Sequence, residues 1–270
     1  SASGDKVSGF VTASIANRLT NFATASMGVS LDNAIFASGN ITINGSSSGN
    51  RGIDASVNVT STNGNVVMNG ATVATIGVYV VAGNVVTGNN ITINGTSTTA
   101  PGWVTQIAGL TINSTSVGGN IAVTGNVIGT PGAAGGIYQT GTITGANGSN
   151  ISFTSNNDIS QNGAVVLATN TSGSAANIVY DTSTGNKTSS IVSGTLTIAS
   201  SGSTSAINYT VKSAGAALNP GLIGTSAIVL PGAITIDNTF GGTAGAGGTP
   251  VSGFVSASAN NLVALATTSI

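Results

Sequence analysis

Short runs in which hydrophobic and polar residues alternate recur along the chain at a nearly fixed distance. The run Asn-Ile-Thr-Ile-Asn-Gly at 40–45 has one copy at 65–70 and another at 90–95, so the step between copies is constant. A fourth copy at 120–125 arrives later than this step requires, which predicts a five-residue loop insertion around 114–119. Whole segments are in register rather than isolated hexapeptides, because three later glycines keep the 25-residue step: Gly52, Gly77 and Gly102.

The alternation within each run predicts a β-strand with one dry face. Successive side chains of a strand point to opposite faces, so every second residue of the run shares one face. That face is apolar in all four copies, whereas the residues between are mostly small or polar, at Thr42, Val67, Thr92 and Ala122. We therefore predict two interior columns, one of Ile41, Val66, Ile91 and Ile121, and one of Ile43, Met68, Ile93 and Val123.

The repeat favours parallel stacking of coils over hairpins. Asn-Gly between apolar runs often marks a hairpin, but strands that repeat at a constant step with one polarity suit a parallel arrangement. We expect each Asn-Gly pair to end its strand in a sharp corner, because both residue types tolerate positive φ. The fold prediction is an all-β parallel β-solenoid of about 25 residues per turn, with two or three short strands per turn and a rise of about 4.8 Å.

Stacked coils bring equivalent residues into columns, and the asparagines are the most informative of these. In an in-register parallel stack, equivalent amides hydrogen-bond along the axis. The sequence therefore predicts two structural ladders, one of Asn40, Asn65 and Asn90 and one of Asn44, Asn69 and Asn94. Looser relatives of the run follow at irregular spacing, at residues 150–153, 164–167, 177–180, 195–198, 207–210 and 233–236.

A second, longer repeat relates two distant segments. The sequence Val-Ser-Gly-Phe-Val at 7–11 returns at 251–255, a 244-residue step, and the likeness continues through the following residues. Such a long spacing indicates one unit of a tandem array. The alternative is two similar segments within one finished domain. We predict an inter-repeat junction at Val7, Phe10, Val251 and Phe254, and the segments 1–38 (junction and repeat start), 39–213 (solenoid), 214–250 (irregular coils or linker) and 251–270 (start of the next repeat).

Composition narrows the range of functions. Among 270 residues there are five Lys or Arg, six Asp or Glu, and no His or Cys, with 40% hydrophobic residues. Five scattered cations cannot form the basic stripe that nucleic acid needs, and no apolar run approaches the length of a membrane span. Without Cys, stability must come from stacking rather than disulfides. The sequence has no initiator Met and no signal peptide, so we expect an internal or processed piece of a longer protein.

Candidate catalytic groups are few. The absence of His and Cys removes the usual metal ligands and nucleophilic triads, so we predict no catalytic, metal or cofactor site. Polysaccharide-cleaving chemistry would need two facing carboxyl groups. Asp32 with Asp54, and Asp158 with Asp181, lie about one turn apart and could be neighbours along the rod. We interpret the aspartates as solvated or turn-capping groups: Asp5, Asp32, Asp54, Asp158, Asp181 and Asp237.

Three further patterns each have an alternative interpretation. The many Asn-x-Ser/Thr triplets are formal glycosylation sites, although stacking explains the asparagines better. Thr42 and Thr92 hint at an ice-binding threonine array, but Val67 interrupts the column. Trp103 and Tyr79 suggest a surface on which sugars stack, although we expect them to fill the coil interior or a loop base.

The style of the repeats resembles that of a known protein family. The residues that carry this resemblance are the Asn-Ile-Thr-Ile-Asn-Gly units and the stretch at 110–129, Leu-Thr-Ile-Asn-Ser-Thr-Ser-Val-Gly-Gly-Asn-Ile-Ala-Val-Thr-Gly-Asn-Val-Ile-Gly. They are similar to the repetitive passenger regions of filamentous haemagglutinin-like exoproteins and related autotransporter adhesins of bacteria. The resemblance covers mainly residues 39–170. It implies a secreted, right-handed parallel β-helix that serves as a surface rod. The chain departs from the family in showing no secretion domain and no evident binding tip.

These observations together favour a non-enzymatic structural role. We expect an extracellular repeat unit of a bacterial surface filament, sheath or adhesin stalk, with a carbohydrate-binding or carbohydrate-degrading β-helix as the alternative. The expected partners are copies of the same unit, as tandem repeats or head to tail, because no end cap is evident in the sequence and open-ended contacts build filaments. Low charge favours lateral bundling, and surface glycans are further candidate partners.

Overall fold

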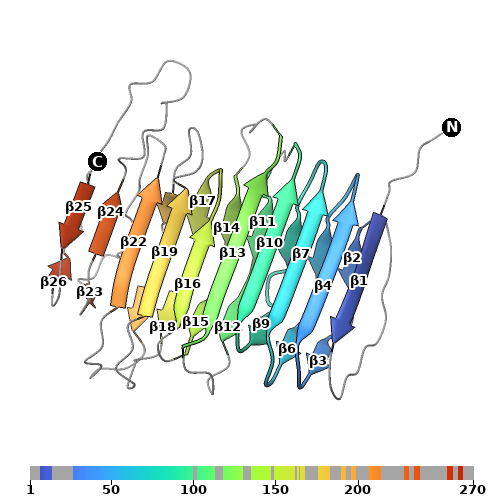
Figure 1. Cartoon of the computed structure of the whole chain (residues 1–270), viewed down its shortest axis with the longest axis horizontal. Coiled ribbons are helices and arrows are strands. Elements are labelled where there is room, and N and C mark those ends of the chain that lie inside the picture. Colours follow the sequence, from blue (N-terminus) through green and yellow to red (C-terminus); the bar gives the residue numbers. More distant parts are fainter. Residues whose placement is uncertain are drawn as a thin grey trace.

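The computed structural model of the chain is an elongated stack of β-strands (Figure 1). It describes residues 7–13, 27–99, 102–112, 118–129, 135–146, 149–161, 163, 165–167, 176–182, 190–192, 196–198, 207–213, 228–230, 234–237, 254–257 and 261–263. Strands are the regular elements throughout this described part, which contains no helix long and apolar enough to span a membrane.

Three sheets run along the stack, and from β2 to β22 the chain visits them in the same order in each coil. Each coil adds one strand to sheet C, one to sheet B and one to sheet A. The strands of sheet A are longest because the repeated run lies there. Sheet A contains β1 (Val7–Ala13), β4 (Ile41–Ser47), β7 (Val66–Thr72), β10 (Ile91–Ser97), β13 (Asn120–Val127), β16 (Asn150–Thr154), β19 (Ala176–Thr182), β22 (Ile207–Ser213), β24 (Ile234–Asp237) and β25 (Phe254–Ala257).

The other two sheets are built from three-residue strands. Sheet C contains β2 (Val29–Leu31), β5 (Ile53–Ala55), β8 (Val78–Val80), β11 (Thr105–Ile107), β14 (Ile137–Gln139), β17 (Ile159–Gln161) and β20 (Ser190–Val192). Sheet B contains β3 (Ile35–Ala37), β6 (Val59–Ser61), β9 (Val86–Gly88), β12 (Leu110–Ile112), β15 (Ile143–Gly145), β18 (Val165–Leu167) and β21 (Leu196–Ile198).

Every neighbouring pair from β4 to β24 in sheet A is parallel, which confirms the predicted parallel β-solenoid. Ile41 lies beside Val66, Val66 beside Ile91, and Ile91 beside Ile121, so the steps of the sequence repeat are the register of the sheet. The irregular spacing of the looser relatives has a simple cause. Those at 164–167 and 195–198 contribute to sheet B through β18 and β21, whereas the others lie in sheet A.

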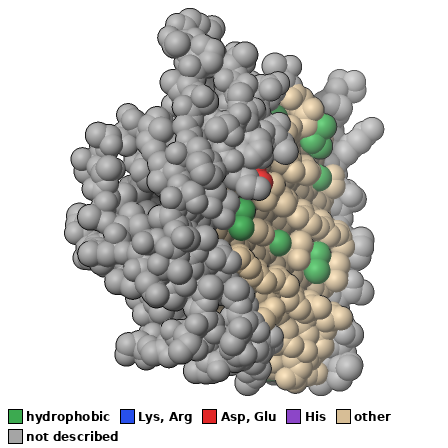
Figure 2. All heavy atoms as spheres, turned by 60° about the vertical axis from the view of Figure 1, so that its left-hand side comes forward, with side chains coloured by type: hydrophobic (Ala, Val, Ile, Leu, Met, Phe, Trp, Pro, Cys, Tyr) green, Lys and Arg blue, Asp and Glu red, His purple; other side chains and the backbone are tan. Residues whose placement is uncertain are grey.

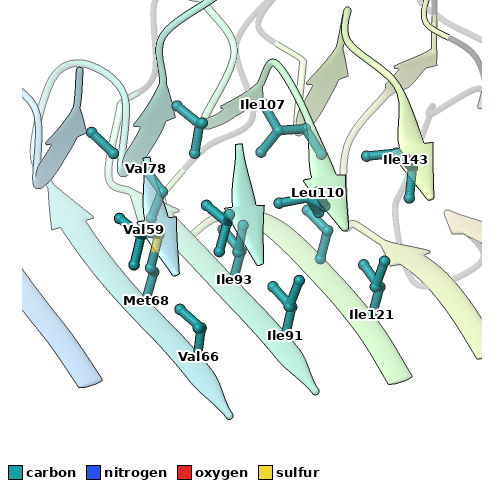
Figure 3. Packing of buried hydrophobic residues seen from close by; sticks show 14 of the residues in the cluster. Val59, Val66, Met68, Val78, Ile91, Ile93, Ile107, Leu110, Ile121 and Ile143 are labelled. Atoms are coloured by element: carbon teal, nitrogen blue, oxygen red, sulfur yellow. The ribbon is translucent and has the colours of Figure 1, made fainter. Parts of the chain in front are cut away.

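The interior is a continuous column of apolar side chains enclosed by the three sheets (Figure 3). Buried and half-buried residues alternate along β4, β7 and β10, as expected for strands with one dry face. The eight predicted interior residues are all at most 1% exposed: Ile41, Val66, Ile91, Ile121, Ile43, Met68, Ile93 and Val123. Side chains from sheets B and C, such as Leu110 and Val78, meet them from the other sides.

The Asn-Gly pairs do not end their strands, so the prediction of a corner there is wrong. Asn44 and Gly45 lie in the middle of β4 and pair in register with Asn69 and Gly70 of β7. The glycine is needed for a different reason. A Cβ atom on Gly70 would collide with the carbonyl of Gly77, where the chain enters the next coil. The same close approach occurs at equivalent glycines, namely Gly45 against Gly52 and Gly125 against Gly136.

Positive φ occurs elsewhere among the described residues. Gly83 (φ 86°) and Gly118 (φ 72°) adopt it, and neither would bring a Cβ atom within 4 Å of another group. Gly83 lies in the turn between β8 and β9, and Gly118 lies just before β13. The corners that need left-handed backbone are therefore the connections between sheets, not the repeated hexapeptide.

The two ends of sheet A reverse direction. β1 pairs antiparallel with β4, and β25 pairs antiparallel with β24, so the two outermost strands run against the eight between them (Figure 1). The sequence showed no end cap, yet each edge of the parallel series in sheet A is covered by a strand. A short antiparallel pair, β23 (Ile228–Leu230) with β26 (Asn261–Val263), lies apart from the three sheets.

The coils also extend beyond the predicted solenoid boundaries. β2 and β3 begin the first coil at Val29, whereas the solenoid was predicted to start at residue 39. β24 continues sheet A into the segment predicted as irregular coils or linker, 214–250. Sequence alternation in 29–37 is only three residues per strand, which is too short to stand out against the longer repeats.

Candidate functional site

An asparagine ladder runs across sheet A where the chain enters the long strands, at or next to the first residue of each strand. The amide nitrogen of Asn90 donates to Oδ1 of Asn65 at 2.8 Å, and the backbone N–H of Asn65 donates to Oδ1 of Asn40 at 2.8 Å. The ladder continues past the predicted three members through Asn120, Asn150 and Asn177, with bonds of 2.7–3.5 Å. It therefore links six successive coils.

A second, shorter ladder lies in the middle of the same strands. The side-chain amide of Asn69 donates to Oδ1 of Asn44, and that of Asn94 donates to Oδ1 of Asn69, both at 2.8 Å. In the next coil the position is Thr124, whose hydroxyl donates to Oδ1 of Asn94 at 3.0 Å. The following residues in register are Thr154 and Asp181, so the column changes chemistry after three asparagines.

The interior changes along the rod as well. The column of Ile43, Met68, Ile93 and Val123 continues in register as Phe153 and Tyr180. These two rings stack with centroids 4.9 Å apart and an interplanar angle of 6°, and both are fully buried. Apolar and aromatic side chains form the core cluster of the described coils, with buried serine and threonine side chains such as Ser97 and Thr105 beside them.

The outward face of sheet C carries the polar and aromatic groups that could contact a ligand. Asp54 pairs in register with Tyr79, and the guanidinium of Arg51 both forms an ion pair with Asp54 and lies 4.0 Å from the centroid of the Tyr79 ring. Ser56 also donates to Asp54 at 2.9 Å. These contacts account for Asp54 being only 4% exposed although it lies on the outer face.

Two further aromatic residues extend this face by two coils. Tyr79, Gln106 and Tyr138 occupy equivalent positions in successive strands of sheet C. Trp103 stacks on Tyr138, with ring centroids 5.4 Å apart and an interplanar angle of 23°. The indole lies so close to Gly135 that a Cβ atom there would collide with it. We call Arg51, Asp54, Tyr79, Trp103, Gln106 and Tyr138 the aromatic face of sheet C.

The expectation that Tyr79 and Trp103 fill the interior or a loop base is wrong for Tyr79, which alternates with the buried Val78 and Val80 and so points outward. The pairing of Asp54 with Tyr79 is visible as another 25-residue step, so the sequence held a signal for it. The sequence held no signal for the contact of Trp103 with Tyr138, because insertions of unequal length separate their coils.

The aspartates of the described part lie at separate places in or next to sheets C and A. Asp32 is exposed and accepts a hydrogen bond from Ser30, whereas Asp54 is engaged with Arg51. Asp158 directly precedes β17 in sheet C, and Asp181 lies in β19 of sheet A. Within the described residues no group of three His, Cys, Asp or Glu side chains gathers as a metal ion requires. Asp5 lies outside these residues, and only the strand position of Asp237 is described.

The outer surface is polar but nearly uncharged. On the face seen in Figure 2, hydrophobic side chains of the described residues occur as separate spots on a surface of polar and backbone atoms. Three large hydrophobic side chains are exposed among the described residues: Phe36 lies in β3, whereas Val73 and Ile128 directly follow β7 and β13. On the outer face of sheet A, Val67 separates Thr42 from Thr92 in register, so the threonines form no continuous array there.

Comparison of the chain with protein-family models, with curated proteins and with solved structures gave no match.

Proposed function

We propose that this chain is a structural repeat unit of an extracellular bacterial surface filament, sheath or adhesin stalk and that it carries out no catalysis. The observation that supports this proposal best is the uninterrupted register of sheet A from β4 to β24. Each added coil repeats the same backbone pairing and interior packing, so the arrangement has no intrinsic length limit. Each coil of about 25 residues lengthens such a stack by about 4.8 Å and is bonded to its neighbours along three sheets, so the product is a stiff rod.

The polar contacts support a mechanical role in the same way. In the described coils, hydrogen bonds between side chains run along the axis through the two asparagine ladders. Bonds between neutral amides are insensitive to salt and to pH in the ordinary range, unlike ion pairs. With a net charge of −1 over 270 residues, neighbouring rods repel one another little, and this favours lateral bundling.

Electron microscopy of the purified chain tests this proposal. Negative-stain images should show thin straight rods, and higher concentration should produce side-by-side bundles. Incubation with a panel of polysaccharides should release no sugar. Compact particles without an elongated axis, or release of reducing sugar that depends on the folded protein, would contradict the structural role.

A second candidate function, carbohydrate binding, is favoured by the aromatic face of sheet C. Sugars stack on accessible aromatic rings, and the half-buried Tyr79 and Tyr138, with Trp103 beside Tyr138, place such rings on the outward face of sheet C. Glycan-array binding of the wild type, lost in Trp103→Ala and retained in Phe36→Ala, would support it. Phe36 is a matched control because it is an exposed aromatic residue on sheet B. Equal binding by both variants would refute it.

A further inference from the structure

We propose that consecutive 244-residue units join through one antiparallel strand that both units share. This inference rests on the proposed function in so far as it takes the partner to be another copy of the same unit. The strand is the repeated segment itself, which appears as residues 10–13 in β1 and as 254–257 in β25. In an array, each internal copy would pair with the last coil of the preceding unit and with the first coil of the following unit.

The first support is that the two copies pair in the same register at opposite ends of sheet A. In β1, Ala13 lies opposite Ile41 and Val11 lies opposite Ile43. In β25, Ala257 lies opposite Ile234 and Val255 opposite Ile236. The columns of sheet A connect Ile41 with Ile234 and Ile43 with Ile236 through every intervening coil. Equivalent residues of the segment therefore meet equivalent positions of the solenoid at both ends.

The second support is that the two copies use opposite edges of their backbone. The N–H of Ile41 donates to Asn65 and that of Val66 to Asn90, so residues of the Ile41 column direct their amides toward the following coil. By the same column, Ile234 and Ile236 direct theirs toward β25. Directly opposed residues of an antiparallel pair exchange both hydrogen bonds or neither. Val255 and Ala257 therefore bond to β24, and Phe254 and Ser256 face the open side.

The situation at β1 is the complement. The residues of β4 between those of the Ile41 column direct their amides away from the following coil, toward β1. The opposite residues Thr12 and Phe10 form backbone hydrogen bonds with β4. The backbone N–H and C=O groups of Val11 and Ala13 therefore point to the open edge of β1. Thr12 and Phe10 are the counterparts of Ser256 and Phe254. One strand can therefore satisfy both neighbours at once, because the edge left open at one end is the edge used at the other.

This use of opposite backbone edges at the two ends is informative, because a shift of the pairing by one residue at either end would remove it. Both copies would then need the same edge, and one strand could not serve two units. An open edge of a sheet invites a further strand, and the strand that fits here is already encoded at the required spacing. Sheet A would then run unbroken through the array, with eight parallel strands and one antiparallel strand per unit, an axial repeat of about 43 Å.

A disulfide test in a two-unit chain examines this junction directly. Residues 1–270 continued by residues 27–270 preserve the 244-residue step, and the chain has no natural cysteine. Ser256→Cys in the first unit with Thr42→Cys in the second places the pair directly opposite across the proposed junction, within disulfide reach. Mild oxidation should cross-link most molecules, as detected by mass spectrometry of proteolytic fragments.

Two matched variants control this result. Ser256→Cys with Thr235→Cys joins a pair that is opposite within one unit, so it should cross-link in one-unit and two-unit chains alike. Ser256→Cys with Asn44→Cys of the second unit is displaced by two residues and should stay mostly reduced. If the displaced pair forms as readily as the Thr42 pair, or if only the Thr235 pair forms, the shared strand is refuted.

Amide hydrogen exchange gives a readout that needs no substitution. The amides of Val255 and Ala257 should be protected in the one-unit chain and in the two-unit chain. Those of Phe254 and Ser256 in the first unit of the two-unit chain should exchange at least about tenfold more slowly than in the one-unit chain. Unchanged exchange at Phe254 and Ser256 would overturn the inference. Rods without this protection would refute the junction but leave the structural role intact, whereas protection in a protein that forms no rods would do the reverse.

Discussion

The two asparagine ladders lie on the same strands, four residues apart, yet one links six coils and the other only three asparagines. The ladder that starts at Asn40 continues through the coils with long insertions, whereas the ladder that starts at Asn44 gives way to Thr124. The long ladder lies where the chain enters sheet A, and two of its side chains accept a backbone N–H of the next coil. The short ladder, in contrast, connects side chains alone.

The difference shows which position fixes the register. At the strand entry, an amide side chain can satisfy both its neighbour's side chain and a backbone donor that the coil geometry leaves unbonded. Replacing it removes a side-chain bond and a backbone bond together, whereas a mid-strand replacement removes bonds between side chains only. In mid-strand the sheet already satisfies the backbone, so threonine or aspartate is tolerated there.

The largest loss of stability is expected from a charge placed in the apolar interior behind the strands that carry both ladders. Ile91→Asp places a carboxylate in a fully buried apolar column, and the free energy of unfolding should fall by about 3–5 kcal/mol or more. Thr92→Asp on the outer, half-buried face of the same strand is the control and should change it by about 1 kcal/mol or less. Thermal or denaturant unfolding measures both. Equal stability of the Ile91 variant and the parent would mean that the inside and outside faces are misassigned.

A smaller but still clear loss is expected where the chain passes close to itself between coils. Gly70→Ala forces a Cβ atom against the carbonyl of Gly77, so the unfolding free energy should drop by about 1–3 kcal/mol. Gly102→Ala is the matched control, because a Cβ atom there meets nothing within 4 Å. Chemical denaturation should separate the two variants, and a Gly70 variant as stable as the control would argue against this close approach.

The comparison of the ladders itself predicts unequal losses. Asn90→Ala removes a side-chain bond to Asn65 and the acceptor for the backbone N–H of Asn120, and it should cost about 2 kcal/mol. Asn94→Ala removes bonds to Asn69 and Thr124 only, and it should cost about 1 kcal/mol. Asn63→Ala, at an exposed position outside both ladders, should be nearly neutral. If Asn94→Ala is the more damaging of the two, the mid-strand position would be the one that sets the register.

The smallest effect is expected from salt. Neutral amides and apolar packing dominate both regions, and the ion pair of Arg51 with Asp54 is shielded by the Tyr79 ring. Raising NaCl from about 0.05 M to about 1 M should therefore leave the effect of either ladder substitution unchanged. Thermal melts of the Asn90 and Asn94 variants at both concentrations measure this, and a ladder effect that shrinks with salt would point to a charged contribution.

Much of the fold could be predicted because the repeat is local and regular. The alternation in residues 40–45 and its copies identifies the inward residues, and the 25-residue step identifies which strands are neighbours. The prediction of corners failed because the same residue pair, Asn-Gly, can lie in a turn or inside a strand. Gly45 was taken as a corner because Asn-Gly is common in turns, but it is required by the nearness of Gly52, which belongs to another coil. The candidate site was predicted in part, since Tyr79 and Trp103 were singled out but Tyr138 was not.

The sequence by itself determined the parallel stacking, the dry columns and the places where amides could form ladders, because period and alternation are properties of neighbouring residues. Only the tertiary structure decided the grouping of strands into three sheets, the contact of Trp103 with Tyr138, and the antiparallel pairing of β1 and β25. The antiparallel pairing depends on which backbone edges remain open once the coils are stacked, and the ring contact depends on how insertions of unequal length are accommodated. An open edge is a property of the assembled sheet, and no single segment carries it.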